Sequence, residues 1–243
     1  MILILGGTSE ARELAAALVA AGIEVTSSLA GRVANPRLPE GAVRIGGFGG
    51  PVGLAEWLRE NDVSCVVDAT HPFAERITEN AATACTRAGL PLLALSRPGW
   101  SERPGDRWFW ADDLAAAADA IPGLGSRVLL TTGRQGLAAF AGLGHTWLLI
   151  RCVDPPEPPL PAQHKLLLDR GPYTLEGELK LIDAHGIDLI VTKDSGGEHT
   201  IAKLDAARER GLPVLIVRRP ARPSVAGVAT VAEALDWARA HAG

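Results

Sequence analysis

The chain has few of the residues that cross-link a protein, anchor it or bind a metal. Its three cysteines (Cys65, Cys85 and Cys152) are odd in number and show no C-x-x-C spacing, so reduced thiols and a cytoplasmic location are expected. The six histidines lack metal-ligand spacing, so no metal site is predicted. No apolar run approaches the ~18 residues that span a bilayer, and Gly6 and Gly7 end the first apolar segment too early for a signal peptide. No association with a membrane is expected.

An excess of positive charge is also missing. The formal net charge is −4, which argues against a general nucleic-acid or membrane-surface binder. Of the 24 basic residues only 4 are lysines. The arginines suit bidentate contacts with carboxylate or phosphate, although an Ala-, Arg- and Gly-rich composition explains their total equally well. Function is therefore assigned only to arginines at particular positions.

Several catalytic signatures are absent. The Tyr-x-x-x-Lys pair of short-chain dehydrogenases fails because Gly177 stands four residues after Tyr173, the only tyrosine. No H-E-x-x-H or G-x-S-x-G motif occurs. These absences indicate that a bound cofactor carries the chemistry, while the protein supplies orientation and charge.

What the sequence does contain is a regular alternation of strand and helix patterns. Strands are expected over 2–5, 23–30, 42–45, 63–69, 90–96, 126–133, 146–153, 165–170, 187–194 and 212–220. Helices are expected over 10–21, 52–61, 72–88, 174–185, 198–210 and 231–241, with a short one ending at 141. Repeated β-α-β units predict an α/β fold in which helices cover both faces of a parallel sheet.

The alternation is interrupted once, by a segment over 97–110 rich in proline, glycine and charge. The pattern G-L-P-x-L-x-x-x-R-P occurs on either side of it, at 89–98 and at 211–220. A general preference for Gly-Leu-Pro before strands would explain part of this repeat, but the matching Arg-Pro favours two similarly folded halves. We therefore predict two Rossmann-like domains, 1–100 and 101–243, with mainly parallel sheets facing across a cleft. Ligands are expected beyond the carboxyl ends of the strands.

The first strand runs into GGTSEA, a variant of the G-x-G-x-x-G dinucleotide fingerprint. Ala11 is small enough for the helix-packing role of the last glycine, and Thr8 offers a hydroxyl where the middle glycine exposes backbone. Arg12 lies one turn into the helix, within reach of a phosphate. The expected phosphate loop comprises Gly6, Gly7, Thr8, Ser9 and Arg12. The alternative is a plain glycine turn in which Thr8 or Ser9 caps the helix.

The end of the second strand indicates which nucleotide binds. NAD-binding units carry an acid about 20 residues after the glycines, where it holds the ribose 2′-hydroxyl. Here Ser28, Gly31 and Arg32 stand in that region and no acid does. Hydroxyls followed by an arginine suit a 2′-phosphate, so NADP(H) is favoured over NAD(H). A solvated Arg32 is the alternative.

Other strand ends carry further candidates. In DATHPFA, His71 is expected beside the nicotinamide or the substrate and is a candidate proton donor, although a His-Pro pair is often only a helix entry. TTGRQG, KDSGGEHTIAK and the GPY turn lie after strands or before helices in the second half, and Ser195-Gly-Gly forms an anion-accepting turn. The substrate-binding candidates in these loops are Thr132, Gly133, Arg134, Tyr173, Lys193, Asp194, Ser195 and Lys203.

The order of motifs resembles one family. GGTSEAR, SLAGR, DATHPFA, RPGW, TTG, GPY and KDSGG, followed by K-x-x-A-A and G-L-P-V, resemble the precorrin-6A reductase family of cobalamin biosynthesis over essentially the whole chain. Tyr173 stands where that pattern leads us to expect phenylalanine. The resemblance implies an NADPH-dependent reductase that converts the tetrapyrrole precorrin-6A to precorrin-6B.

Such a substrate carries many carboxylates, which the resemblance assigns to cations at strand ends: Arg97, Arg134, Lys193 and Lys203. The proton donor stays open among His71, Tyr173 and Asp194, with water or a substrate carboxyl as alternatives, and we expect no single side chain to be essential. A metal-free or cobalt-bearing macrocycle fits equally, and neighbouring pathway enzymes could hand it over. The rival interpretations are another NADP-dependent reductase or epimerase of a small acid, and a non-enzymatic two-domain nucleotide- or anion-binding module.

Overall fold

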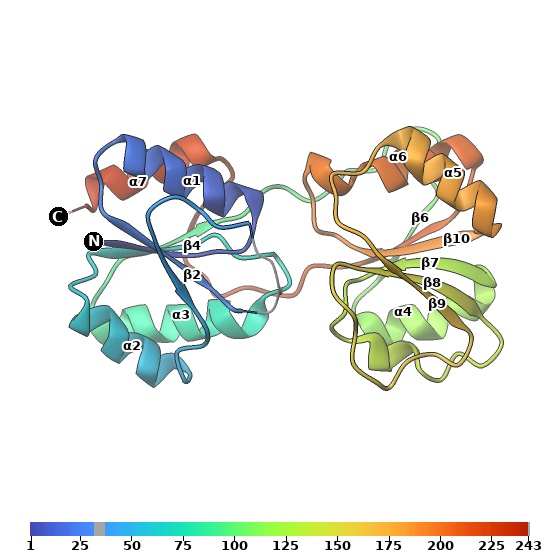
Figure 1. The fold of residues 1–243 in the computed structure, drawn as a ribbon, viewed down its shortest axis with the longest axis horizontal. Coiled ribbons are helices and arrows are strands. Elements are labelled where there is room, and N and C mark those ends of the chain that lie inside the picture. Colours follow the sequence, from blue (N-terminus) through green and yellow to red (C-terminus); the bar gives the residue numbers. More distant parts are fainter. Residues whose placement is uncertain (32–36, 243) are drawn as a thin grey trace. The chain divides into compact units, whose positions relative to one another are not determined.

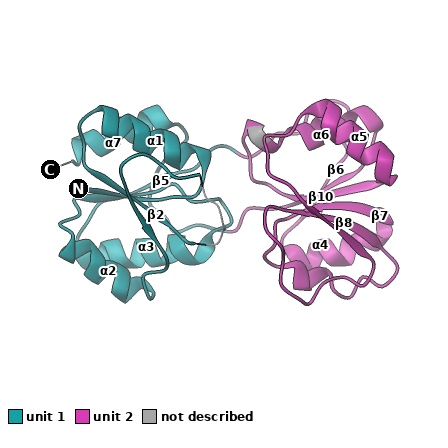
Figure 2. Ribbon diagram, in the orientation of Figure 1, with its two compact units in different colours: residues 1–98, 221–243 teal, residues 99–220 magenta. Residues whose placement is uncertain are grey.

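The chain forms two units, each built on one six-stranded sheet. The computed structural model describes residues 1–31 and 37–242 and divides the chain into unit 1, residues 1–98 with 221–243, and unit 2, residues 99–220 (Figure 2). The predicted fold class, two α/β units with parallel sheets, is confirmed. The predicted division at 100/101 differs from the structure in one respect, because residues 221–243 return to unit 1 instead of remaining in the second domain.

The sheet of unit 1 has the spatial order of a dinucleotide-binding fold. All its strand pairs are parallel. In order across the sheet, the strands are β3 (Ala42–Ile45), β2 (Val25–Leu29), β1 (Ile2–Leu5), β4 (Cys65–Asp68), β5 (Leu92–Leu95) and β12 (Ala226–Val228). Counting β12 as the sixth strand of the unit, this is the 3-2-1-4-5-6 arrangement of the Rossmann fold.

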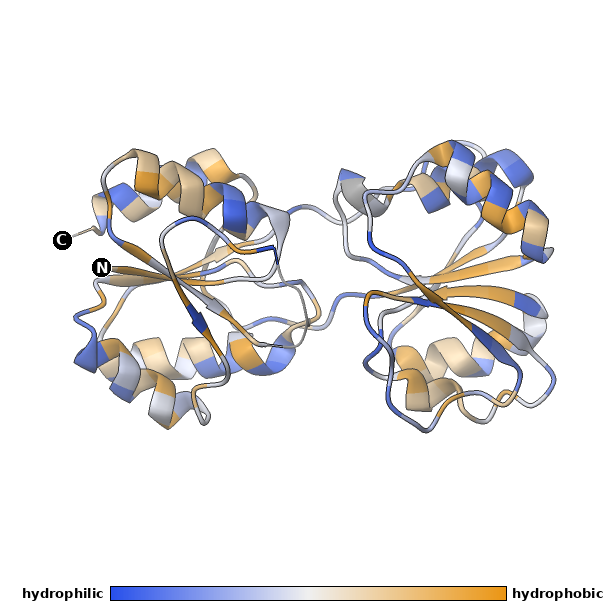
Figure 3. Cartoon of the chain, in the orientation of Figure 1, coloured by the Kyte–Doolittle hydropathy of each residue, from blue (hydrophilic) through white to orange (hydrophobic). Residues whose placement is uncertain are grey.

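Helices cover both faces of this sheet, and Figure 1 shows them as two pairs: α1 (Ser9–Ala20) with α7 (Val231–Ala240), and α2 (Pro51–Glu60) with α3 (Glu75–Ala88). Successive side chains of a strand point to opposite faces. Accordingly, Ile2 and Ile4 of β1 pack in a core with α1 and α7, while Leu3 and Leu5 pack with α2 and α3. Strand β1 is therefore hydrophobic along its whole length (Figure 3).

Unit 2 repeats the arrangement. Its strands, in order across an all-parallel sheet, are β9 (His164–Leu168), β8 (Trp147–Cys152), β7 (Arg127–Thr131), β10 (Leu189–Lys193), β11 (Val214–Val217) and β6 (Trp108–Ala111). The helical segments are α4 (Leu114–Ala120), α5 (Leu175–His185), α6 (Ala202–Arg210), and the 3₁₀ turns η1 (Ile121–Gly123), η2 (Leu137–Phe140) and η3 (Glu198–Thr200). Helices α5 and α6 cover one face, and α4 covers the other (Figure 1).

The Arg-Pro repeats mark the two places where the chain changes units. Arg97-Pro98 follows β5 and ends the first part of unit 1, and Arg219-Pro220 follows β11 and ends unit 2. After each crossing the chain forms an edge strand of the sheet that it has entered: β6 pairs with β11, and β12 pairs with β5. The prediction of two similarly folded halves is therefore confirmed at the level of strand order.

Some local predictions were wrong or incomplete. The segment 97–110 was expected to be a linker, but Trp108 begins strand β6; this strand, helix α4 and strand β12 were not predicted. The helix expected from Pro72 begins only at Glu75, because the preceding turn closes with the Ala74 N–H donating to the His71 carbonyl at 2.8 Å. The helix expected to end at 141 is the 3₁₀ turn η2. Short edge elements of this kind carry little periodicity of their own.

The return of α7 to unit 1 gives a stability prediction. Ala238 is fully buried against the core that contains Ile2 and Ile4. Ala238→Asp would bury an unpaired charge, which costs at least about 3 kcal/mol, so we expect thermal unfolding about 10 °C lower. Ala232→Asp, exposed in the first turn of the same helix, is the matched control and should change little. Hydrogen exchange should accelerate in β1 and α1; acceleration confined to β7 and β8 would contradict the assignment.

Candidate active site

The carboxyl ends of β1 and β4 lie side by side in the middle of the unit 1 sheet, where Leu5 pairs with Asp68. The chain continues from β1 to β2 on one side, whereas β4 leads to β5 on the other. This reversal is the topological switch point, and α/β proteins bind ligands in the crevice that it leaves. The loops that meet there are GGT (6–8) and ATHPFA (69–74).

The glycine turn prepares the start of α1 for an anion. Gly7 has φ +118°, a conformation that side-chain-bearing residues rarely adopt. The Gly6 N–H donates to the Ser28 carbonyl at 3.0 Å, which fixes the turn to the end of β2. Beyond it, the first turn of α1 presents backbone N–H groups that have no intrahelical acceptor, at the positive end of the helix dipole. Phosphate groups bind at helix N-termini for this reason.

Thr8 has a different role from the one expected. Its hydroxyl donates to the Ala69 carbonyl at 2.7 Å and accepts from the Ala11 N–H at 3.1 Å. A hydroxyl has one hydrogen to donate, so it has none left for a phosphate. Thr8 therefore caps α1 and ties the glycine turn to the loop after β4; the alternative of a helix cap was the correct one for its side chain.

Ser9 and Arg97 are directed toward Glu10. The Ser9 hydroxyl donates to Glu10 Oε2 at 3.1 Å, and Arg97 Nη1 lies 2.8 Å from both Glu10 oxygens. Burial favours protonation of this carboxyl, but the hydrogen bonds it accepts and the positive charge of Arg97 together outweigh burial and lower the pKa of Glu10. Arg97 belongs to unit 1 and is matched by a carboxylate there. Arg97 was predicted to bind a carboxylate of the substrate, but in the structure its guanidinium is paired with Glu10.

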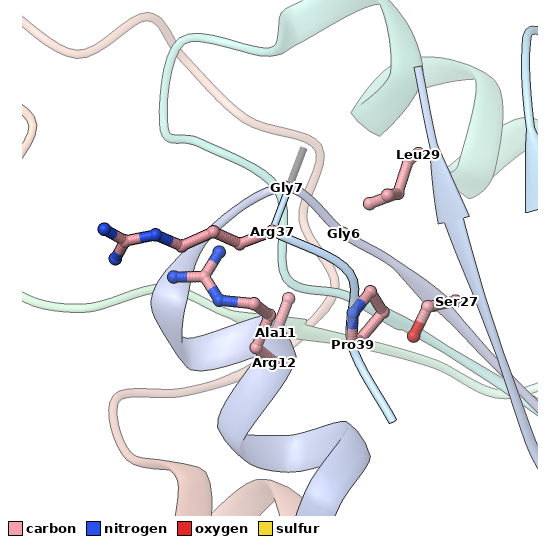
Figure 4. Close-up of a pocket in the computed structure, with 8 residues that line it drawn as sticks. All are labelled: Gly6, Gly7, Ala11, Arg12, Ser27, Leu29, Arg37 and Pro39. Atoms are coloured by element: carbon pink, nitrogen blue, oxygen red, sulfur yellow. The ribbon is translucent and has the colours of Figure 1, made fainter. Parts of the chain in front are cut away.

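Two other arginines converge on the glycine turn. Arg12 and Arg37 line a small pocket that is open to solvent, together with Gly6, Gly7, Ala11, Ser27, Leu29 and Pro39. Figure 4 shows the two guanidinium groups lying next to each other beside the turn. Among the described residues no carboxylate forms an ion pair with either one. Arg12 was expected here, whereas Arg37 lies in a loop that carries no motif and was missed.

The edge between β2 and β3 holds a further cation. Ser28 pairs with Arg44 across the two strands, and the Ser28 hydroxyl accepts from Arg44 Nη1 at 2.9 Å. The same guanidinium donates to the carbonyls of Gly46 and Gly47 and lies 3.6 Å above the Phe48 ring centroid. Within the part of the chain that is described, it makes no ion pair with a carboxylate. The predicted residue Arg32 lies outside the described residues, and Gly31 precedes it in a left-handed conformation at φ +69°.

The loop after β4 is organised around Asp68. This buried carboxylate accepts from the Thr70 N–H at 3.1 Å and from the Thr70 and Thr78 hydroxyls, both at 2.6 Å. These bonds tie the loop to α3 and fix the position of His71. His71 Nδ1 accepts from the Phe73 N–H at 3.3 Å, which places the proton of the neutral ring on Nε2.

The C-terminal segment brings Arg222 to the same loop. Arg222 Nη2 lies 3.5 Å from the His71 carbonyl and 4.0 Å from Asp68 Oδ2. Its Nε and Nη1 are buried and have no hydrogen-bond partner among the described residues. Buried donors that lack acceptors are uncommon in native proteins and mark places where an anionic ligand could bind. Arg222 was not predicted as a residue of this site, because the predicted boundary placed residues 101–243 in the other domain.

In unit 2, Asp194 is a structural anchor. Its carboxylate accepts from the Trp100 N–H at 3.0 Å and lies 3.3 Å from Arg219 Nε, which also donates to the Asp194 carbonyl at 2.9 Å. A Cβ on Gly99 would come within 2.5 Å of Asp194 Oδ2. The end of β10 thus holds the segments next to both unit crossings. A carboxylate occupied as an acceptor in this way is a poor proton donor, so the structure argues against Asp194 as the catalytic acid.

Four further candidates of the second half, Thr132, Gly133, Lys193 and Ser195, lie with Arg134 at the carboxyl ends of β7 and β10, the two middle strands of unit 2. The loop after β7 carries Thr132, Gly133 and Arg134, and the Thr132 hydroxyl is buried with no hydrogen-bond partner among the described residues. The Ser195 N–H donates to the Lys193 carbonyl at 2.7 Å, which folds the KDSGG turn back on β10. The switch point of unit 2 therefore brings these two predicted loops together, as expected from the strand order.

Lys203 is buried near the Arg151–Glu178 ion pair, and the partly exposed Tyr173 lies against the same arginine. The Tyr173 ring lies 3.9 Å from the guanidinium carbon of Arg151, which forms an ion pair with Glu178 at 2.7 Å. Lys203 Nζ donates to the Thr200 carbonyl at 2.6 Å, and its pKa is lowered to about 7, chiefly by burial. Arg151 and Glu178 were not predicted from the sequence, because one lies on a buried strand and the other on the inner face of a helix, with no motif around either.

The described residues do not form a metal centre. In residues 1–31 and 37–242 no three His, Cys, Asp or Glu side chains gather into a set that could hold a metal ion. The same residues contain no helix with the length and apolar character needed to cross a membrane. The three thiols are buried, and burial raises the pKa of Cys65 to about 11 and that of Cys85 to about 12, so neither is poised as a nucleophile.

The fold and these loops define a two-unit α/β protein with a dinucleotide-type switch point in unit 1 and an equivalent edge in unit 2. The family model described as Precorrin-6x reductase CbiJ/CobK matches residues 1–239. The chain belongs to this family of reductases, as the motif resemblance predicted.

Individual relatives agree with the family model along the whole chain. A Rhodococcus erythropolis protein named Precorrin-6A reductase is 57% identical over 97% of this chain and 96% of its own length. A solved structure of CobK precorrin-6A reductase has a TM-score of 0.93 at 43% identity, covering 99% of this chain and 96% of that one. A Salmonella typhimurium protein named Cobalt-precorrin-6A reductase is 31% identical over 93% of this chain and 89% of its own length.

The lowered pKa of Lys203 gives a prediction for stability against pH. In the folded chain Lys203 loses its proton near pH 7, whereas in the unfolded chain it keeps it to about pH 10.5. Between these values the unfolded chain holds one more proton, so this residue makes the free energy of unfolding rise with pH by up to roughly 1.4 kcal/mol per pH unit. Lys203→Met removes this contribution. Its stability relative to the wild type should therefore be greatest near pH 7 and decline toward pH 10.

Denaturant unfolding at several pH values measures this difference. The control is Lys180→Met, an exposed lysine on α5 paired with Glu176, which should leave the wild-type pH slope unchanged. Parallel stability curves for the wild type and Lys203→Met would contradict a buried, titrating Lys203.

Proposed function

We propose that this protein reduces precorrin-6A to its dihydro product, precorrin-6B, with NADPH as the reductant in cobalamin biosynthesis. The observation that carries the proposal is the full-length identity of 57% to a relative named Precorrin-6A reductase, together with the matching family model. It agrees with the 3-2-1-4-5-6 strand order and the anion-binding turn of unit 1. The rival interpretation as a non-enzymatic binding module has no comparable support.

The residues of unit 1 fit a dinucleotide. The start of α1 offers backbone N–H groups to a pyrophosphate, with Arg12 and Arg37 beside it. The unpartnered donors of Arg222 lie at the adjacent loop and suit an anionic group of the same ligand. When bound, the nicotinamide supplies a hydride. The protein's part is to hold and orient the cofactor and to place the loop of His71 near its reactive end.

The choice of NADPH over NADH rests on the edge between β2 and β3. The end of β2 carries Ser28 where an NAD-binding unit would carry an acid. Arg44 is fixed against the Ser28 hydroxyl and has no carboxylate partner among the described residues, so it suits the extra phosphate on the ribose. Among the described residues its guanidinium has the best structural support for this role, and the predicted Arg32 lies outside them.

The substrate is the acidic macrocycle, and we assign it to the carboxyl edge of the unit 2 sheet, around Thr132, Arg134, Lys193 and Ser195. The metal-free form is favoured over the cobalt form, because identity falls from 57% to 31% between the relatives named for each. Of the named proton donors, His71 and Tyr173 remain with water or a substrate carboxyl, and the expectation of no single essential side chain stands. Delivery by neighbouring pathway enzymes and a cytoplasmic location remain predictions.

The central test is turnover. Purified protein should oxidise NADPH in the presence of precorrin-6A, with a matching change in the absorbance of the macrocycle, and should act more slowly on cobalt-precorrin-6A. Binding of both NADPH and precorrin-6A without any oxidation would reject the enzymatic assignment. Faster turnover of the cobalt form would reverse the choice of substrate.

Arg44→Ala tests the cofactor assignment. Losing one charge-assisted contact with the 2′-phosphate should raise the KM for NADPH about ten- to a hundredfold, while the KM for NADH changes little. Arg12→Ala should weaken both nucleotides alike, because it is placed at the phosphates that they share. Arg59→Ala, an exposed change in the last turn of α2, is the control. An equal loss for NADH and NADPH in Arg44→Ala would show that Arg44 only stabilises its loop.

A further inference from the structure

Unit 2 contains a buried charged cluster that binding of the dinucleotide does not use. Arg151 on β8, Glu178 on α5 and Lys203 on α6 have exposed fractions of 6%, 2% and 3%. Arg151 Nη1 donates to Glu178 Oε1 at 2.7 Å, while Glu178 Oε2 has no hydrogen-bond partner among the described residues. Charged groups are seldom buried to this extent unless their charges are balanced.

The charges of this cluster are not balanced. The cluster itself holds two cations and one carboxylate, so it carries one surplus positive charge when Lys203 is protonated. A second carboxylate, that of Asp169, acts on the Tyr173 hydroxyl. The charged groups that act on Lys203 are Arg151 from β8 and Glu178 from α5. The uncharged groups in contact with it are the Thr200 carbonyl, 2.6 Å from Nζ, and the Trp100 ring, with its centroid 4.7 Å from Nζ.

Two aromatic rings lie against the cations. Trp100 lies against Lys203, and Tyr173 lies 3.9 Å from the guanidinium carbon of Arg151; both aromatic residues are partly exposed. Hydrogen bonds hold both rings in place, from Trp100 Nε1 to the Gly197 carbonyl at 3.1 Å and from the Tyr173 hydroxyl to the Asp169 carbonyl at 3.2 Å. Partly exposed aromatic rings backed by cations suit a flat, anionic ligand, because the rings offer stacking surface and the charge beneath them attracts the anion.

We propose that the Arg151–Glu178–Lys203 cluster is a substrate-recognition element, whose surplus positive charge attracts a carboxylate of a macrocycle stacked on Trp100 and Tyr173. This inference rests on the proposed function, which supplies an acidic tetrapyrrole, and it adds the determinant that selects for the acidic groups. Lys203 acts here as a positioning residue through its field and needs no contact with the substrate. When one aromatic ring separates the Lys203 charge from a substrate carboxylate, their partly screened attraction changes the Kd of the substrate by about tenfold.

Protonation of Lys203 links this recognition to pH. Burial lowers the pKa of Lys203 to about 7, and a carboxylate held nearby would raise it again. The substrate should therefore bind more tightly at pH 6.5 than at pH 8.5 and take up a proton as it binds. Arg151 stays charged throughout this range, so Lys203 is the titrating partner.

The experiment measures the Kd of precorrin-6A by calorimetry at pH 6.5 and 8.5, in buffers of different ionisation enthalpy. The proteins are wild type, Lys203→Met, Lys203→Arg and the exposed control Lys180→Met. Lys203→Met should raise the Kd about tenfold at pH 6.5 and abolish proton uptake, with NADPH affinity unchanged. Lys203→Arg should stay within about threefold of the wild type without titrating, and Lys180→Met should match the wild type. The fully methyl-esterified macrocycle should bind all four proteins equally.

A Kd of Lys203→Met for precorrin-6A equal to that of the wild type would overturn the proposal. So would an equal loss of affinity for the neutral ester, because a merely structural role of Lys203 would weaken the binding of both ligands. If Lys203→Met does not fold, the wild type alone decides: absence of proton uptake and a Kd independent of pH would reject the idea. Failure of the proposed function gives a different result, namely charge-dependent binding of the macrocycle with no oxidation of NADPH.

Discussion

Both faces of each parallel sheet must be covered, and the rest of the structure depends on this constraint. The central strands are apolar on both sides, as Ile2 and Leu3 of β1 illustrate, so helices have to pack above and below them. Unit 1 obtains its fourth helix, α7, only from the end of the chain, which is why the chain crosses between the units twice. Covered faces leave the strand ends as the places where a ligand can reach the backbone, and the candidate site lies there.

Pairing of charges then separates the arginines that build the protein from those that could serve a ligand. Arg97 and Arg219 follow equivalent strands and are matched by Glu10 and Asp194. Arg12, Arg37 and Arg44 surround the glycine turn and the end of β2 without a carboxylate partner in the described part of the chain. A guanidinium that is already matched contributes little to anion binding, because its charge is compensated before a ligand arrives. The functional assignment therefore follows the pairing of the arginines more than their number.

Much of the fold could be predicted because periodicity is a local property. The long buried strands and the amphipathic helices were recognised from their patterns, and the Arg-Pro repeat indicated two similar units. Strands β6 and β12 were missed because they are short edge strands of four and three residues, stabilised by pairing with β11 and β5 rather than by their own pattern. The interruption of the strand–helix pattern near residue 100 does mark a change of unit, but it cannot indicate that a later segment, residues 221–243, returns to the first sheet.

The site was predictable in the same uneven way. Gly6, Gly7, Arg12 and Ser28 follow from motif and position, since glycine turns and strand ends are visible in the chain. The contacts of the Thr8 and Asp194 side chains could not be predicted in the same way, because they depend on the acceptors and donors that tertiary packing brings to them.

The sequence by itself thus determined the strand–helix alternation, the two-unit plan, the glycine turn and the family, because these depend on neighbours along the chain. Only the tertiary structure decided that α7 completes unit 1, that Arg44 reaches Ser28 and that Arg151, Glu178 and Lys203 form one cluster, because contacts between residues far apart in sequence exist only once the sheets have formed.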